Sequence, residues 1–257
     1  MKVKILQSKP LRAGGIVKLD QLVEKISQQV LAQLNESLPR EDLDCHGCAF
    51  RSCGVANRAC DQARFDKKVP VGVSARHVHV TQSDLEVLYG DRHQLTVFAP
   101  LYQPGAFAAK ETVTIVGRRM RAIEGVRILG GVRSYSQVEV APTDAIRLGL
   151  DPPIRDSGDL RGAEPITLVG PNGSVHLNEG AIIPSRHVHM TPEEAEDFGV
   201  SESDRLKVHM IGERSLVFEN IRPKIHPDYV LQMHLDTDDA NAAGLRGGEA
   251  VELLKVL

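Results

Sequence analysis

The sequence has no tryptophan, and only six phenylalanines and four tyrosines stand among its 257 residues. It also lacks an excess of positive charge: 31 Lys and Arg against 34 Asp and Glu give a net charge of −3, which argues against a nucleic-acid partner. No apolar run approaches the roughly 20 residues needed to span a bilayer, and residues 1–10 lack the apolar core of a secretory signal. We therefore expect an aliphatic core, about two domains, no membrane partner and a cytoplasmic location.

An amphipathic segment lies in the first predicted region, residues 1–40. Its apolar residues recur at helical spacing, which predicts a helix over residues 17–37 that ends before Pro39. Two interpretations remain open. The helix packs on the core of its own protein, or it lays its apolar face into a groove of a partner protein. Docking to a partner is our working hypothesis.

Four cysteines gather in the second predicted region, residues 41–68. They follow the spacing C-x2-C-x4-C-x6-C, at Cys45, Cys48, Cys53 and Cys60. Four thiolates so close together predict a metal site, and they are compatible with either a tetrahedral Zn²⁺ or a [4Fe–4S] cluster. Reduced free cysteines are the alternative, whereas disulfides are not expected in a cytosolic chain.

Beyond residue 68 the sequence changes to short β-like runs separated by Gly and Pro. Strands that recur about every ten residues predict a mostly β fold, either a barrel or a sandwich. Only brief helices are expected between them, and these should begin at Thr81, Thr143, Thr191 and Thr237. Thr191 is followed by Pro192 and Glu194, a sequence typical of a capped helix start.

An internal duplication organises the same region. Residues 73–85 reappear as residues 183–195, with R-H-V-H identical in both copies, and residues 137–150 reappear as residues 232–245. The two pairs come in the same order, which predicts a duplicated domain. We place the repeats at residues 69–155 and 156–257.

Each repeat carries an H-x-H pair that is suited to binding a metal. On a β-strand the two-residue period puts both imidazoles on one face, and the aligned blocks match Glu139 with His234. Imidazole and carboxylate are common zinc ligands, and six of them suffice for two ions. The predicted ligands are His77, His79, Glu139, His187, His189 and His234. The simpler interpretation, polar side chains on a solvated strand face, fits a single copy better than two equivalent copies.

Arg133 is the candidate for binding an anionic substrate. It follows the Gly130-Gly131 pair and lies six residues before Glu139. A guanidinium binds phosphate and carboxylate groups through two parallel hydrogen bonds, so an arginine here predicts a phosphate or carboxylate substrate.

Several motifs within residues 69–257 resemble the phosphate propanoyltransferase (PduL-type phosphotransacylase) family. They are V-G-V-S-A-R-H-V-H-V, Q-P-G-A-F-A-A-K-E-T-V-T-I-V-G, I-L-G-G-V-R and S-Q-V-E-V. The resemblance implies two small tandem β-barrels, two zinc ions, and the reaction acyl-CoA + phosphate ⇌ acyl phosphate + CoA with a propanoyl or acetyl group. It also implies a place in the lumen of a bacterial microcompartment, as in propanediol degradation, with shell or lumen proteins as partners of the N-terminal helix. Whether the chain forms a homo-oligomer is left open.

The resemblance also implies roles for individual residues. The family's metal ligands fall on the six residues predicted above, and its phosphate-binding arginine falls on Arg133. Its CoA contacts fall on Ser74, Arg127, Leu129 and Asn241. The sequence departs from the family's pattern near residues 100–103, where no basic residue stands to contact CoA, and Lys110 is a candidate replacement.

Two rival functions belong to other classes. A double-cupin-like metal hydrolase or oxygenase also carries H-x-H on a strand, but a cupin motif needs a Glu a few residues later, and here helix starts follow both pairs. A non-enzymatic microcompartment scaffold would use the helix and the cysteines, and it leaves the six ligand-type residues unexplained.

Overall fold

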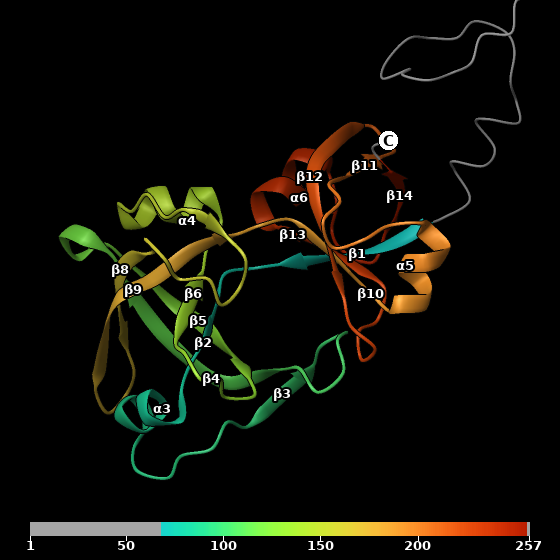
Figure 1. Ribbon diagram of the computed structural model, residues 1–257. Helices are drawn as coiled ribbons and strands as arrows, with labels where there is room; N and C mark the ends of the chain where they lie inside the picture. Colours follow the sequence, from blue (N-terminus) through green and yellow to red (C-terminus); the bar gives the residue numbers. More distant parts are fainter. Residues whose placement is uncertain (1–67, 256–257) are drawn as a thin grey trace, which may run out of the picture. The chain divides into compact units, whose positions relative to one another are not determined.

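The computed structural model describes residues 68–255, with side chains described as far as residue 253 (Figure 1). The predicted docking helix in residues 1–40 and the cysteine region with Cys45, Cys48, Cys53 and Cys60 lie outside the described residues. No helix in the described part is long and apolar enough to cross a membrane.

The first barrel is a closed ring of six strands. Its order is β4 (Phe107–Val116), β5 (Ala122–Gly130), β2 (His77–His79), β6 (Gln137–Glu139), β9 (Ser174–Pro184) and β8 (Glu164–Val169), and β8 pairs with β4 to close the ring. The short strands β3 (Val97–Pro100) and β7 (Ile154–Arg155) extend it beside β4 and β9. The interior is aliphatic, with Ile115, Ile128 and Leu168 fully buried, as the scarcity of aromatic residues predicts.

The second barrel repeats this arrangement with six other strands. Its order is β1 (Lys68–Ser74), β13 (Gln232–Asp236), β10 (His187–Met190), β12 (Leu216–Ile225), β11 (Leu206–Met210) and β14 (Ala250–Lys255), and β14 pairs with β1 to close it. Val188, Met190 and Met233 lie in its core. The predicted fold class, two small β-barrels from an internal duplication with short helices, is confirmed for the described residues.

The two barrels exchange one strand each. β1 directly precedes β2 in the chain but pairs in parallel with β13 of the second barrel. β9 directly precedes β10 but pairs in parallel with β6 of the first barrel. Strand membership therefore differs from the predicted repeats 69–155 and 156–257, since β1 belongs to the second barrel, and β8 and β9 to the first. The choice of a parallel partner depends on contacts distant in sequence, which a repeat boundary does not reveal.

Within residues 68–255, four short helices connect the strands: α3 (Gln82–Tyr89), α4 (Pro142–Leu148), α5 (Pro192–Phe198) and α6 (Thr237–Ala243). Thr81 and Thr191 cap α3 and α5 as predicted, and Thr191 forms a reciprocal capping box with Glu194. α6 begins at Thr237 as expected, with Asp236 as its capping residue. α4 begins one residue before the expected Thr143, at Pro142, with Ala141 as its capping residue. A single turn of 3-10 helix, η1 (Arg118–Met120), joins β4 to β5.

Candidate functional site

The first group of predicted ligands comes together on β2 and β6. His77 lies opposite Glu139 in the antiparallel register, and the neighbouring pair of Val78 and Val138 is buried in the barrel core. Because side chains alternate along a strand, His77, His79 and Glu139 share the outer face. Nε2 of His77 lies 3.4 Å from Oε2 of Glu139, and Nε2 of His79 lies 4.0 Å from Oε1. One ligand atom from each of the three residues lies within 4.8 Å of the others.

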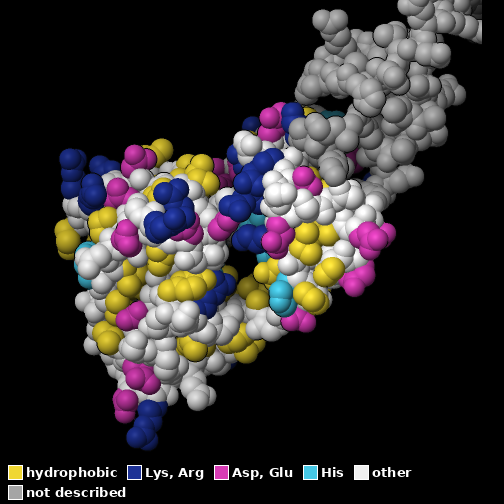
Figure 2. Space-filling view, viewed as in Figure 1, with side chains coloured by type: hydrophobic (Ala, Val, Ile, Leu, Met, Phe, Trp, Pro, Cys, Tyr) yellow, Lys and Arg dark blue, Asp and Glu magenta, His cyan; other side chains and the backbone are white. Residues whose placement is uncertain are grey.

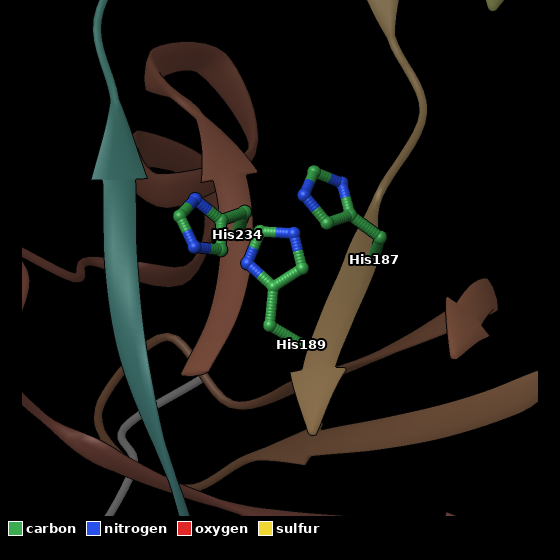
Figure 3. A group of neighbouring side chains, drawn as sticks. All are labelled: His187, His189 and His234. Carbon is green, nitrogen blue, oxygen red and sulfur yellow. The ribbon is translucent and has the colours of Figure 1, made fainter. Parts of the chain in front are cut away.

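The second group has the same construction on β10 and β13. His187 lies opposite His234, and their rings are nearly parallel, with centroids 5.0 Å apart and planes 3° apart. The centroid of His189 lies 4.7 Å from the centroids of both other rings. Figure 3 shows the three rings gathered together, two from β10 and one from β13. Their ligand atoms also lie within 4.8 Å of one another.

Backbone carbonyls orient one histidine of each group in the same way. Nδ1 of His77 donates to the carbonyl of Ala75 at 2.9 Å, and Nδ1 of His187 donates to the carbonyl of Ser185 at 2.8 Å. A histidine whose Nδ1 carries the proton presents the lone pair of Nε2, which is the arrangement of most metal-binding imidazoles. Ser74 approaches the second group, with Oγ 3.3 Å from Nδ1 of His234.

Three buried imidazole nitrogens in these groups have no hydrogen-bond partner: Nδ1 of His79, Nδ1 of His189 and Nε2 of His234. A buried polar atom without a partner is costly unless something binds it. Two histidines with a carboxylate in one group, and three histidines in the other, are donor sets that zinc accepts. The described residues therefore fit a metal ion in each group.

Four of the five histidines in these groups are held neutral, which is the form that binds metals. Burial is the main cause, and it lowers the pKa of His79 to about 2, that of His189 to about 3 and that of His234 to about 4. Burial likewise lowers the pKa of His187 well below its usual value. The charge of Glu139 in the first group opposes this lowering of the pKa of His234, so the two ligand groups lie close enough to influence each other electrostatically.

Arg133 is tied to the first group by a chain of hydrogen bonds. Its NH1 donates to the hydroxyls of Tyr135 at 2.9 Å and Ser157 at 3.0 Å. Nε2 of Gln137 donates to the same Ser157 hydroxyl at 2.8 Å and to Oε1 of Glu139 at 2.6 Å. Positive charge on Arg133 also lowers the pKa of His79, which shows its proximity to the site.

The residues expected to contact CoA occupy different positions. Arg127 lies opposite His77 on β5, its NH1 donates to the carbonyl of Ala109, and its guanidinium lies 4.5 Å from the centroid of the Phe98 ring. Leu129 follows two residues later on the same strand, whereas Asn241 is exposed on α6. Of the four, Ser74 is the one whose side chain lies within hydrogen-bonding distance of a predicted ligand side chain, that of His234.

Lys224 is a site residue that the sequence does not reveal. It lies opposite His189 on β12, and its neighbour Pro223 is opposite buried Val188, so the lysine shares the outer face with the histidines. Its charge acts on all three histidines of the second group. Burial lowers the pKa of Lys224, while Asp156 and Glu139 oppose that shift. Its position depends on which strand pairs with β10, for which the sequence gives no local signal.

Fold and site together define a class: a duplicated β-barrel protein that presents two histidine-rich ligand groups and an arginine beside them. A model of the phosphate propanoyltransferase family matches residues 70–246. The chain therefore belongs to the phosphate propanoyltransferase family, and it is an acyltransferase. The resemblance in its sequence motifs is confirmed, and this membership favours an enzyme over a scaffold or an oxygenase.

Curated relatives agree with this assignment, and each is named phosphate propanoyltransferase. The relative from Lachnoclostridium phytofermentans is 51% identical over 186 residues, covering 72% of this chain and 87% of the relative. The relative from Thermotoga maritima is 47% identical over 206 residues, covering 79% and 98%. The relative from Priestia megaterium is 49% identical over 195 residues, covering 76% and 89%.

Proposed function

We propose that this chain catalyses acyl-CoA + phosphate ⇌ acyl phosphate + CoA with a short acyl group, propanoyl or acetyl, at a site that holds two zinc ions. One ion is assigned to each ligand group, and the ligands are His77, His79, Glu139, His187, His189 and His234. The observation that carries the proposal is the pair of equivalent groups, with Arg133 hydrogen-bonded into the first. Bound zinc supplies a Lewis acid that stabilises the thiolate of CoA as a leaving group.

Arg133 binds and orients the phosphate that reacts. Tyr135 and Ser157 both accept hydrogen bonds from NH1, which fixes the plane of the guanidinium and leaves its remaining N–H groups for an anion. A phosphate oxygen held there attacks the thioester carbonyl, the new C–O bond forms as the C–S bond breaks, and CoA leaves as the thiolate. Orientation by Arg133 supplies the proximity that this step needs.

Lys224 adds a second positive charge on the face of the second group. It lies opposite His189, and the charges that act on it include those of Glu139 and Arg133. We assign it the role of holding negative charge on the acyl phosphate near the ligand groups. CoA is proposed to contact Ser74, Arg127, Leu129 and Asn241, with its sulfur near His234 because Ser74 lies beside that ring.

The test is the substitution Arg133→Ala, with Arg133→Lys as a partner variant and Arg92→Ala as a matched control on an exposed arginine. Acyl phosphate formation from propanoyl-CoA and phosphate is measured together with zinc content by mass spectrometry. Loss of one preorganised charged donor should reduce turnover at least about 100-fold with zinc content unchanged. Turnover near that of the control would contradict the assignment of Arg133.

The proposed location is the lumen of a bacterial microcompartment, reached through the amphipathic segment of residues 1–40. In cells that make compartments, a fluorescent protein fused to residues 1–40 should gather at the compartments, and uniform fluorescence would contradict docking.

The metal analysis also examines the proposed cysteine site, because a [4Fe–4S] cluster colours the protein brown and contains iron, whereas a zinc site is colourless.

A further inference from the structure

A polar cavity of about 660 Å³ within the described residues is lined by side chains of both barrels. Arg155 and Asp156 are the last residue of β7 and the residue after it. Arg205 directly precedes β11, and Asn220 and Arg222 lie on β12. The cavity adjoins the second ligand group, since Arg222 lies opposite His187 in the β10–β12 register. Figure 2 shows Lys and Arg side chains gathered at the hollow in the described part.

The cavity carries more positive than negative charge. Four arginines and two aspartates line it, which leaves a net charge of +2. Two of the arginines are neutralised: Arg161 forms a two-pronged ion pair with Asp159 at 2.9 and 2.8 Å, and Arg222 pairs with Asp156. The charge that is left resides on Arg155 and Arg205.

The guanidinium groups of Arg155 and Arg205 donate hydrogen bonds to backbone carbonyls. Nε and NH1 of Arg155 donate to the carbonyls of Arg161 at 3.2 Å and Ile154 at 3.0 Å. NH1 of Arg205 donates to the carbonyl of Asp204 at 2.9 Å. A carbonyl orients a guanidinium without neutralising it, so both side chains keep a full charge and further N–H groups at the cavity wall. Two such arginines match the charge of a dianion.

Asn220, which lines the same cavity, has an unusual backbone conformation. Asn220 has φ = 60°, in the left-handed region, and it lies where the pairing of β11 with β12 shifts register. Gly125 occupies the equivalent position in the first repeat and has φ = 67°. It lies two residues before Arg127, which is opposite His77. The irregularity in strand pairing, a β-bulge, therefore occurs in both copies of the duplicated fold. In the second copy it carries the amide side chain of Asn220, which lines the cavity.

We infer that this cavity binds a phosphate group as a dianion, with Arg155 of the first barrel and Arg205 of the second as its charge partners and the Asn220 amide as a further donor. This phosphate is distinct from the one held by Arg133 in the proposed reaction. Inorganic phosphate and the phosphate end of a nucleotide share the required chemistry. A ligand held from both sides joins the barrels at the point where Arg222 and Asp156 already form an ion pair between them.

The experiment measures binding and requires no turnover. The full chain carrying Arg133→Ala, which weakens the reacting phosphate site, is titrated by calorimetry with inorganic phosphate and separately with adenosine 3′,5′-bisphosphate. Arg155→Gln and Arg205→Gln are compared with Arg92→Gln, an exposed arginine outside the cavity. Each cavity variant should weaken binding of at least one probe by about tenfold or more, the loss expected for one charged hydrogen bond.

The two probes separate the sources of the ligand. Weakened binding of both probes identifies a site for free phosphate, and weakened binding of the bisphosphate alone identifies a nucleotide site. Dissociation constants for both probes within twofold of the control would overturn the inference, as would the absence of binding to the parent chain. Arg155→Lys and Arg205→Lys keep the charge, so they preserve a folded cavity if the Gln variants unfold, and binding should then weaken by less. Because activity is not read, failure here leaves the proposed acyl transfer untouched.

Discussion

In the absence of bound metal, the stability of the protein should depend strongly on pH, and His79 offers the sharpest test. The residue is 4% exposed, and burial lowers its pKa from 6.5 to about 2. In the unfolded chain the same imidazole titrates near 6.5. Between these two values the unfolded state binds a proton that the folded state does not, so the free energy of unfolding falls as the pH falls below about 6.5.

The size of the effect follows from the width of that window. From pH 6.5 to about pH 5, one group that titrates only in the unfolded state costs about 2 kcal/mol, at roughly 1.4 kcal/mol per pH unit. This free-energy difference does not depend on the exact pKa of His79 in the folded state, as long as that pKa lies below 5. Above about pH 6.5 the contribution is constant, because the imidazole is neutral in both states.

Urea unfolding of the chelator-treated protein at about pH 7.5 and pH 5 measures this difference. In the variant His79→Gln the loss of stability between the two pH values should be smaller than in the unsubstituted chain by about 2 kcal/mol. The exposed His176 supplies the control, as His176→Gln. An equal loss in the unsubstituted chain and in His79→Gln would refute the reasoning that burial keeps this imidazole neutral.

Three further substitutions test the packing that positions the site, each by the free energy of unfolding. Thr191→Ala removes the side chain that caps α5, the helix that directly follows β10, and should lower the free energy of unfolding by about 1 kcal/mol. Leu85→Ala empties a fully buried position of the first barrel and should cost about 2–5 kcal/mol. Gly117→Ala places a Cβ 2.4 Å from the carbonyl oxygen of Leu148 and should cost about 1–3 kcal/mol, whereas an unchanged stability would show that this backbone moves freely.

The ligand groups could be predicted from the sequence because they rest on local properties. The two-residue period of a strand puts His77 and His79 on one face, and the aligned blocks match Glu139 with His234. The structure brings both groups together through the antiparallel registers that pair His77 with Glu139 and His187 with His234. Their role as zinc ligands remains a proposal.

The rest of the site depends on contacts that no local pattern encodes. Lys224 faces the histidines because β12 pairs with β10, and its equivalent in the first repeat is Leu129, so the duplication gives no signal. Ser157 joins Arg133 to the first group from a position just after the predicted boundary between the repeats, where no motif marks it. Pairing partners and loop positions are set by the tertiary fold.

The exchange of β1 and β9 sets the order in which the two barrels can assemble while the chain is being synthesised. The first barrel has all its strands once β9 is made, at residue 184. β1 is made before any of these strands, yet its partners β13 and β14 are among the last described residues to appear. At about 5–20 residues per second, the intervening chain takes roughly ten to forty seconds to make. Throughout this time β1 must stay unpaired, and after residue 184 it does so beside a barrel whose strands have all been made. The second barrel, which carries the three-histidine group, closes only when translation has delivered β14.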